Sequence, residues 1–264
     1  MNPQPPAILD DMTHPITAGA EPWSHLSDGQ NGALVLHGFT GNPDSVRGVA
    51  ESLADAGFHV ELPRLPGHGT VVEDMVSTRW ADWLGEAEAA YQRLLQRSTN
   101  IVVVGLSMGG TLTLRLGVEH PEIVGLVCIN PLTRPQAPEV IEMLRGMAEQ
   151  GVSVMPGIGS DIADPDAKES AYEGTPIEAL VSLLVDGLEP LSGQYPKMRM
   201  PLLLLSSPQD HVVEPAQSDF LAERYGGPVE RITLERSYHV ATQDYDKDLI
   251  FEATSKFAAQ VTSR

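Results

Sequence analysis

The stretch Ile101-Val-Val-Val-Gly-Leu-Ser-Met-Gly-Gly110 decides the fold of this chain. Its β-branched run predicts a buried strand, and the G-x-S-x-G pattern that follows predicts a sharp turn into a helix. Gly105 and Gly109 take up little space where the strand and helix backbones pass close to each other. The turn presents the hydroxyl of Ser107 at the end of the sheet, and the helix N-terminus beyond it favours developing negative charge. Ser107 is therefore the candidate nucleophile.

Short apolar runs lie on both sides of this stretch and alternate with amphipathic segments. Several of the runs are apolar nearly throughout, which is typical of parallel strands buried on both faces. The alternation predicts an α/β fold, with a mostly parallel central sheet flanked by helices on both faces. The expected strands are Ala33–His37, Phe58–Leu62, Ile101–Gly105, Ile123–Asn130, Leu202–Ser206 and Glu230–Leu234. The expected helices are Pro43–Ala56, Trp80–Arg97, one around Thr111–Val118, Pro215–Arg224 and Lys247–Ala259.

One connection is much longer than a single crossover helix requires. Residues 132–200 separate the strand that ends near Pro131 from the strand that starts near Pro201. Helical stretches at Glu139–Gln150 and Pro176–Gly187 flank Gly151–Gly174, which is rich in Gly, Pro and Asp. We expect this segment to cap the site rather than fold separately, and such segments commonly decide substrate choice. The predicted division is a core of residues 1–131 and 201–264 with a cap of residues 132–200.

A serine nucleophile of this kind needs an acid and a base, which follow it in that order along the chain. His239 lies just after the last predicted strand and before the last helix, where its loop reaches the serine. Asp210 follows a buried strand and is placed to hold the imidazole in the required tautomer. His211 is interpreted as a solvated neighbour, and Glu214 as a charge at a helix N-terminus. The sequence thus predicts Ser107 as nucleophile, His239 as base and Asp210 as acid.

Two backbone N–H groups are candidates for stabilising a developing oxyanion. One belongs to Met108, directly after the nucleophile, and the other to Phe39 in the glycine-punctuated loop after an earlier strand. Both donors are main-chain groups, so their side chains are free to pack against a substrate. We interpret the His37 side chain as a hydrogen-bonded structural histidine.

The charge of the chain argues against a nucleic-acid partner. Among 264 residues, 36 are acidic and 17 basic, which gives a formal net charge of -19 at pH 7. Nucleic acid requires a basic surface, and so does electrostatic docking on anionic lipid. The simple consequence of the charge is solubility through self-repulsion.

Composition sets further expectations for compartment and cofactors. No apolar run approaches the roughly 18 residues that span a bilayer, and Met1–Asp11 lacks the features of a signal peptide. Cys128 is the only cysteine, so no intrachain disulfide forms. A cytoplasmic protein is expected. The absence of a His/Cys cluster, of G-x-G-x-x-G and of a P-loop predicts no metal and no cofactor.

Other motif-like segments have simpler interpretations. Pro63–Gly69 is interpreted as a structural turn. The acids Asp161, Asp164 and Asp166 lack the spacing of a calcium loop. The acids Asp244, Asp246 and Asp248, which follow His239, are expected on a solvated surface.

Taken together, the motifs resemble those of the bacterial monoacylglycerol lipases and their thermostable carboxylesterase relatives, which have the α/β-hydrolase fold. The resemblance extends from about Gly19 to Phe257, although Pro131 to Pro156 match no pattern of the family. The matching core motifs are His37-Gly-Phe-Thr-Gly41, Pro63-Arg-Leu-Pro-Gly-His-Gly69, Gly105–Leu114, Asp210-His-Val-Val213 and Ser237–Thr242. The matching cap runs are Gly159-Ser-Asp-Ile162 and Ala171-Tyr-Glu-Gly-Thr-Pro176.

The resemblance implies further features of the fold and the site. The small, mobile cap would be inserted between the sixth and seventh strands and would form an apolar acyl tunnel. In the lipases, a cap glutamate contacts the glycerol moiety, and the matching residue here is Glu169. A strand-end asparagine that assists it matches Asn130, and a cap isoleucine that narrows the passage matches Ile158.

The implied activity is that of a serine hydrolase that cleaves carboxylic esters, with monoacylglycerols giving free fatty acid and glycerol. A broad carboxylesterase for short and medium chains is an open alternative, and a non-catalytic ligand-binding protein a remote one. A thioesterase or peptidase would use the same residues. The expected partner is a small lipid or ester. Transient contact of the cap with lipid aggregates and the oligomeric state stay open.

Overall fold

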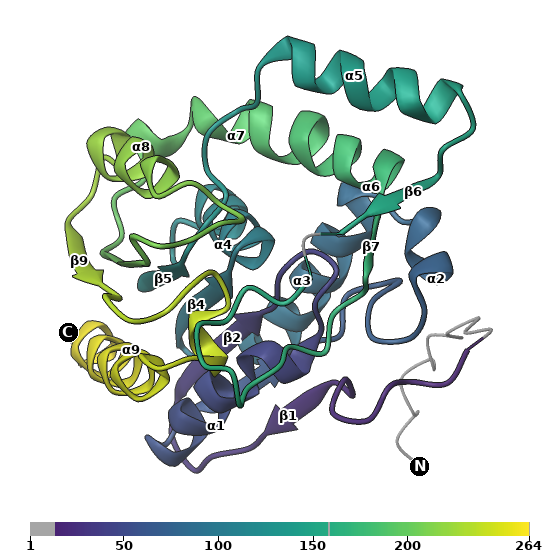
Figure 1. Ribbon diagram of the computed structural model, residues 1–264. Helices are drawn as coiled ribbons and strands as arrows, with labels where there is room; N and C mark the ends of the chain where they lie inside the picture. The colour runs from purple at the N-terminus through teal and green to yellow at the C-terminus, as the bar shows by residue number, and fades with distance from the viewer. Residues whose placement is uncertain (1–13, 158, 264) are drawn as a thin grey trace, which may run out of the picture.

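A mixed, mostly parallel sheet forms the centre of the molecule. The computed structural model describes residues 14–157 and 159–263, so the expectation for Met1–Asp11 lies outside the described residues. Seven strands follow the order β1-β3-β2-β4-β5-β8-β9 (Figure 1). β1 pairs antiparallel with β3, and the other pairs are parallel, as predicted. The strands are β1 (Trp23–His25), β2 (Asn31–Leu36), β3 (His59–Leu62), β4 (Asn100–Leu106), β5 (Gly125–Ile129), β8 (Leu202–Ser206) and β9 (Val229–Thr233).

Helices cover both faces of this sheet, and each face has its own apolar cluster. In β2, Ala33 and Val35 point into the cluster packed by α1 and α9, whereas Leu34 and Leu36 point into the cluster packed by α3 and α4. This alternation follows from the two-residue period of a strand. Burial on both faces explains why the runs are apolar throughout. The helices are α1 (Arg47–Asp55), α3 (Trp80–Leu95), α4 (Met108–Glu119) and α9 (Lys247–Thr262).

The predicted strands and helices of the core are all present, with ends shifted slightly. The short elements β1 and α2 (Val72–Val76) were not predicted, because each offers too few residues for a periodic pattern. The remaining core elements are η1 (Pro43–Val46), α8 (Ala216–Arg224) and η4 (Ala241–Gln243).

The long connection between β5 and β8 forms a largely helical insertion with a small cluster of its own. Leu144 of α5 packs in this cluster with Ile177, Leu184 and Leu188. Figure 1 shows α5 beside the α6 to α7 segment at one end of the molecule, while the chain between β6 and β7 returns across the core. The elements are α5 (Pro138–Glu149), β6 (Val154–Pro156), β7 (Gly174–Pro176), α6 (Ile177–Ser182), the π-helical η2 (Leu183–Leu188), α7 (Glu189–Ser192) and η3 (Tyr195–Lys197).

The position of the insertion differs by one strand from the expectation. The resemblance places it between the sixth and seventh strands, but in the described residues it follows the fifth strand of the sheet, β5. The count is lower by one because, in the described chain, β1 is the one sheet strand that precedes β2. The β6–β7 hairpin inside the insertion is a separate two-stranded sheet.

The parallel strands carry the candidate residues to one edge of the sheet. The loops after β2, β4, β5, β8 and β9 all leave at carboxyl ends of strands, where open α/β sheets bind their ligands. Among the described residues, no helix is both long and apolar enough to cross a membrane.

Candidate active site

Ser107 sits on a strained turn between β4 and α4. Its backbone has φ 57° and ψ -119°, a region that costs a non-glycine residue energy and that is concentrated at functional sites. The turn depends on the flanking glycines. A Cβ on Gly105 would overlap the backbone of Gly109, and a Cβ on Gly109 would overlap the carbonyl of Leu36. The predicted spacing of small residues therefore has a steric cause at both positions.

The loop after β2 lies against this serine. A Cβ built on Gly38 would lie 3.3 Å from Ser107 Cβ, so Phe39 follows a residue that contacts the nucleophile. Met108 begins α4, where the first N–H groups of a helix have no partner inside the helix. Met108 follows Ser107 in the chain and Phe39 follows Gly38, and the role of their N–H groups as oxyanion donors stays a prediction. The Phe39 ring packs edge-on against Trp83, with 5.7 Å between ring centroids.

His37 fixes the start of the same loop from a buried position. Its Nε2 accepts the N–H of Leu65 at 3.1 Å, so a neutral ring carries its proton on Nδ1, which donates to the Gly38 carbonyl at 3.0 Å. Burial lowers the pKa of His37 well below its usual value, and the neighbouring His68 adds to this effect. The ring is therefore neutral near pH 7. These contacts agree with the structural role predicted for this side chain and for the Pro63–Gly69 turn.

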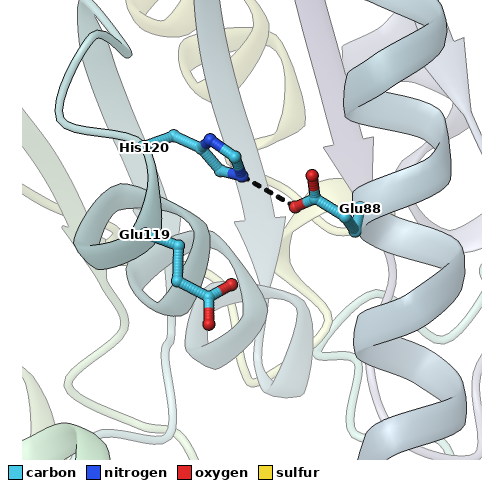
Figure 2. Close-up of side chains that lie close together, drawn as sticks. All are labelled: Glu88, Glu119 and His120. Carbon is cyan, nitrogen blue, oxygen red and sulfur yellow. Dashed lines mark hydrogen bonds and ion pairs between the residues drawn. The ribbon is translucent and has the colours of Figure 1, made fainter.

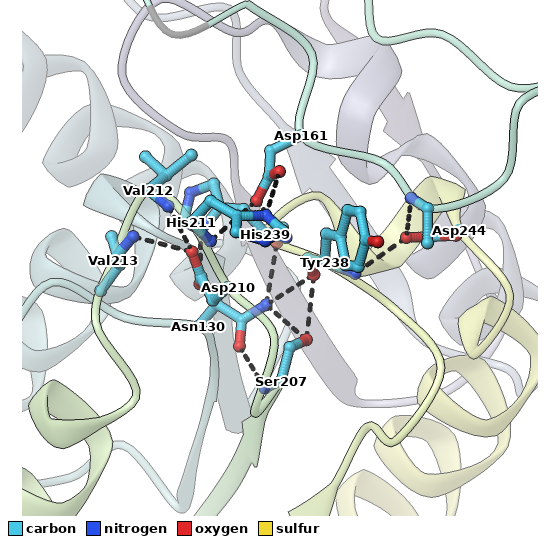
Figure 3. Close-up of polar contacts among 11 residues, drawn as sticks. Asn130, Asp161, Ser207, Asp210, His211, Val212, Val213, Tyr238, His239 and Asp244 are labelled. Carbon is cyan, nitrogen blue, oxygen red and sulfur yellow. Dashed lines mark hydrogen bonds and ion pairs between the residues drawn. The ribbon is translucent and has the colours of Figure 1, made fainter.

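Asp210 and His239 form a short, buried pair at the ends of β8 and β9. Asp210 Oδ2 lies 2.7 Å from His239 Nδ1, and the two side chains are 1% and 8% exposed (Figure 3). The other oxygen, Oδ1, accepts the N–H groups of Val212 and Val213 at 2.8 and 2.7 Å. These two backbone hydrogen bonds orient the Asp210 carboxylate independently of its contact with the imidazole. Within the described chain, neither Ser107 Oγ nor His239 Nε2 has a hydrogen-bond partner, which is compatible with a pair that aligns on substrate.

Asn130 supports the loop that carries the histidine. Its Nδ2 donates to the carbonyl of His239 at 2.8 Å and to Ser207 Oγ at 3.0 Å, and lies 3.3 Å from the carbonyl of Tyr238. Its Oδ1 accepts the N–H of Ser207 at 2.8 Å. The side chain is 3% exposed, and its donors and acceptor are all engaged by the protein. The glycerol contact implied for Asn130 has no support in this geometry.

A second buried carboxylate, Asp161 of the insertion, contacts the histidine loop, the segment after β9 that carries His239. This contact was not predicted from the sequence. Asp161 Oδ2 accepts the backbone N–H groups of both His211 and His239 at 3.1 Å, and Oδ1 lies 2.8 Å from His211 Nδ1 (Figure 3). His211 keeps 58% of its side chain exposed, so it is solvated as expected, but it also pairs with Asp161. The run Gly159-Ser-Asp-Ile162 was the signal in the sequence, although nothing in it shows which loop Asp161 reaches.

The acids that follow His239 are buried, so the prediction of a solvated surface is wrong for two of them. Asp244 is 1% exposed and accepts the N–H groups of Tyr238, Tyr245, Ala163 and Asp164. Asp246 is 8% exposed and accepts the N–H of Arg236. Only Asp248 is exposed. Acidic side chains followed by a helix resemble a solvated face in sequence, but here their oxygens satisfy buried backbone donors.

Glu169 lies between the histidine and the loop after β2. Its Oε1 is 3.0 Å from the position that a Cβ on Gly41 would occupy, so Gly41 leaves room for the carboxyl group. Burial raises the pKa of Glu169 to about 7; the charge of His239 opposes this rise, while Asp44 and Asp161 add to it. A carboxyl group in this position changes charge near neutral pH. Ile158, the other cap residue singled out, lies outside the described residues.

One described cluster has the side chains to hold a metal ion, and it lies away from this site. Glu88 of α3 meets Glu119 and His120 at the C-terminal end of α4, opposite the end that carries Ser107 (Figure 2). His120 already pairs with Glu88 at 2.7 Å, and Arg115 pairs with Glu119. These partners satisfy the cluster without an ion.

Comparison with known proteins agrees with the geometry. A family model described as serine aminopeptidase, S33 (Hydrolase_4) matches residues 30–246. The chain is 42% identical over 250 residues to the thermostable monoacylglycerol lipase of Bacillus sp. (strain H-257), covering 94% of this chain and 97% of the relative. It is 26% identical to the carboxylesterase of Bacillus subtilis (strain 168), covering 87% and 92%. A solved structure from work on LipS and LipT, two metagenome-derived lipolytic enzymes, matches with a TM-score of 0.87 at 38% identity, covering 93% and 100%.

Proposed function

This chain belongs to the serine aminopeptidase, S33 (Hydrolase_4) family of serine hydrolases, and we propose that it hydrolyses monoacylglycerols to free fatty acid and glycerol. The resemblance to lipases and carboxylesterases of the α/β-hydrolase fold is confirmed by the family match and by the 42% identical relative. The observation that carries the choice of substrate is the carboxyl group of Glu169, whose Oε1 lies against Gly41 of the loop after β2 and whose charge interacts with that of His239.

The proposed mechanism assigns Ser107 as nucleophile, His239 as base and Asp210 as the acid that orients the base. His239 Nε2 takes the proton from Ser107 Oγ as this oxygen attacks the ester carbonyl carbon. The backbone N–H groups of Phe39 and Met108 stabilise the resulting oxyanion. The carbon–oxygen ester bond then breaks, and the alcohol leaves with the proton from His239. Water activated by the same histidine attacks the acyl-enzyme and releases the acid.

The glycerol moiety is placed by this mechanism beside His239, because that residue protonates the leaving alcohol. Glu169 lies on the same side, and a carboxylate accepts hydrogen bonds from hydroxyl groups. We therefore assign glycerol recognition to Glu169. For Ile158, the assignment to the narrow part of the acyl passage stays a proposal from the resemblance.

The acyl chain needs an apolar surface next to the nucleophile. Half-buried apolar side chains of the core and the insertion pack against the cluster that contains Met108; they include Phe39, Leu132, Tyr172 and Leu180. We propose that residues 132–200 form a cap on the core of residues 1–131 and 201–264, and that this cap supplies half of the acyl-binding surface.

The test compares kcat/KM for a medium-chain 1-monoacylglycerol with kcat/KM for the methyl ester of the same acid, in the wild type and in Glu169→Ala. The acyl group is constant, so only the alcohol differs. We expect the wild type to prefer the glyceride by about tenfold or more, as two hydrogen bonds from glycerol would give. Glu169→Ala should lose this preference while keeping its methyl esterase activity.

The competing function is a broad carboxylesterase, the activity for which the Bacillus subtilis relative is named. Equal cleavage of both esters by the wild type, with no effect of Glu169→Ala on their ratio, would establish this alternative. Glu173→Ala is the matched control, because Glu173 is an exposed glutamate of the same segment.

A further inference from the structure

The part of the insertion between β6 and β7 is bound to the core at both of its ends. We call residues 161–172 the strap. At one end, Ala163 and Asp164 donate their backbone N–H groups to Asp244 of the histidine loop at 2.7 and 3.0 Å. At the other end, the N–H of Tyr172 donates to the carbonyl of Thr40, next to Phe39, at 3.1 Å.

Side chains add to the second attachment. Tyr172 Oη accepts the N–H of Thr70 at 2.9 Å and donates to the carbonyl of Gly67 at 2.8 Å. Asn42 Nδ2 donates to the carbonyl of Ser170. The strap therefore runs from the histidine loop to the loop after β2, and hydrogen bonds hold it to the core at both ends.

Asp161 is the residue of the strap that contacts both the loop of the acid and the loop of the base. One carboxylate oxygen, Oδ2, accepts the backbone N–H of His239 and that of His211, the residue directly after Asp210. The backbone carbonyl of Asp161 accepts the N–H of Val240 at 3.1 Å. A single residue of the insertion is thus bonded to both loops of the Asp210–His239 pair.

The two loops need such a connection because the sheet holds one of them weakly. His239 follows β9, which is the edge strand of the sheet and is exposed or half-buried at every position. Asp210 follows β8, which is buried between two neighbours. Asn130, directly after β5, and Asp161 of the strap are the described side chains bonded to the main chain of His239.

We propose that Asp161 is a positioning residue that fixes the base relative to the acid, so that the insertion completes the Asp210–His239 pair as well as covering it. This inference rests on the proposed hydrolase mechanism. A displacement of about 1 Å in a catalytic group costs on the order of 100-fold in rate. Removing the carboxylate also leaves the buried N–H of His239 and the part-buried N–H of His211 without this acceptor, and the loops would relax toward other acceptors.

Three variants separate positioning from simple stabilisation. Asp161→Ala removes the bridge. Asp161→Asn keeps it, because the carboxamide oxygen accepts both N–H groups and the amide nitrogen donates to a neutral His211 ring. His211→Ala removes the exposed imidazole but keeps the backbone N–H that Asp161 Oδ2 accepts.

The readouts are kcat and KM for the methyl ester, which lacks the glycerol contacts, and the rate of Ser107 labelling by a fluorophosphonate probe. The three quantities are measured well below the melting temperature of each variant, and each rate is divided by the concentration of folded protein. We expect Asp161→Ala to lower kcat and the labelling rate by about 30- to 100-fold with KM nearly unchanged. Asp161→Asn should stay within about fivefold of the wild type, and His211→Ala within about threefold. If Asp161→Ala does not fold, Asp161→Ser replaces it with the same expectation, since a hydroxyl is too short to reach both amides.

The proposal is overturned if the alanine or serine variant is folded and keeps its kcat within about threefold, or if Asp161→Asn loses as much as Asp161→Ala. A lowered melting temperature with unchanged kcat would show a purely structural role and would also overturn it. Failure of the hydrolase mechanism gives a different result, because the wild type itself would then not be labelled at Ser107 and would cleave no ester.

Discussion

Asp210 and His239 are 29 residues apart in the chain, yet Oδ2 of the first lies 2.7 Å from Nδ1 of the second. The contact forms because their loops leave the carboxyl ends of the adjacent parallel strands β8 and β9. The opposite carboxylate oxygen is held by two backbone N–H groups, so the acid is oriented by its own turn rather than by the histidine. The pair is therefore preorganised before any substrate binds.

Replacing the acid tests this pair directly. Asp210→Asn should lower kcat by about 10³- to 10⁴-fold, because the amide favours the wrong imidazole tautomer. Steady-state kinetics on the methyl ester measures the loss. Glu214→Gln is the matched control, since Glu214 is an exposed acid of the same loop, and it should leave kcat within about twofold. Comparable losses in both variants would mean that Asp210 has no special role.

Replacing the nucleophile gives the largest expected effect. Ser107→Ala should lower kcat by at least about 10⁴-fold and abolish labelling by a fluorophosphonate probe, because members of a triad act as a unit. Intact mass spectrometry after incubation with the probe reports the labelling. If the variant kept most of the esterase activity in a clean preparation, Ser107 would not be the nucleophile.

Asn130 distinguishes a supporting role from a substrate contact. Asn130→Ala should lower kcat by about 10- to 100-fold for the monoacylglycerol and for the methyl ester alike, because the carbonyl of His239 loses its side-chain donor and the hydrogen bonds to Ser207 are lost. Parallel kcat and KM measurements on the two esters test this. A loss confined to the glyceride would instead restore the glycerol contact that the resemblance implies.

The pH dependence of alcohol preference follows from the charge of Glu169. Its pKa is raised to about 7, so the group is mainly neutral at pH 6 and mainly ionised at pH 8. Hydrogen bonds to an ionised acceptor are about twice as strong as neutral ones, so the preference for the glyceride should rise by about fivefold between pH 6 and pH 8.

The readout for Glu169 is the ratio of kcat/KM for the two esters at each pH. Effects of pH on the chemical steps that both esters share cancel in this ratio. Glu169→Gln should make the ratio independent of pH. A ratio that changes with pH in the glutamine variant as strongly as in the wild type would contradict the assignment.

Replacing Gly109, two residues after the nucleophile, has a steric cost that denaturation can measure. Gly109→Ala places a Cβ into the carbonyl of Leu36 and should lower the free energy of unfolding by about 3 kcal/mol or more. Gly146→Ala is the matched control, because a Cβ there meets no atom within 4 Å and Gly146 lies inside α5. That control should gain about 0.5 to 1 kcal/mol from helix propensity. Equal effects of the two substitutions in urea titrations would refute the close packing at Gly109.

The fold was predictable where the pattern is local. Short apolar runs identified the strands β2 to β5 and β8, and the run at 230–234 identified the edge strand β9, which is not buried on both faces. The elbow at Ser107 was recognisable because its glycine spacing has a steric cause at Gly105 and Gly109. Chain order, together with the place of each residue after a predicted strand, then selected His239 and Asp210 as partners, and the structure brings these two together.

The features that the sequence did not predict depend on contacts between segments far apart in the chain. Asp161 lies 78 residues from His239, and its acceptors are used by backbone N–H groups, which have no signature in the sequence. Asp244 was misjudged for the same reason: an acid among other acids is usually solvated, but here its oxygens accept backbone N–H groups from the strap and from its own loop. The position of the insertion was expected from the strand count of the family, which has one more strand before the insertion than the described residues of this chain.

The double attachment of the strap also governs resistance to proteolysis. Residues 151–174 contain the glycines, prolines and aspartates of a typical nicking site, but susceptibility depends on the burial and hydrogen bonding of the backbone rather than on composition. A protease must extend several residues in its cleft, which here requires releasing Ala163 and Asp164 from Asp244 and Tyr172 from Thr40. Cleavage within the strap would therefore wait for a subglobal opening that also detaches the base, so a nicked molecule and an inactive molecule should arise in the same event.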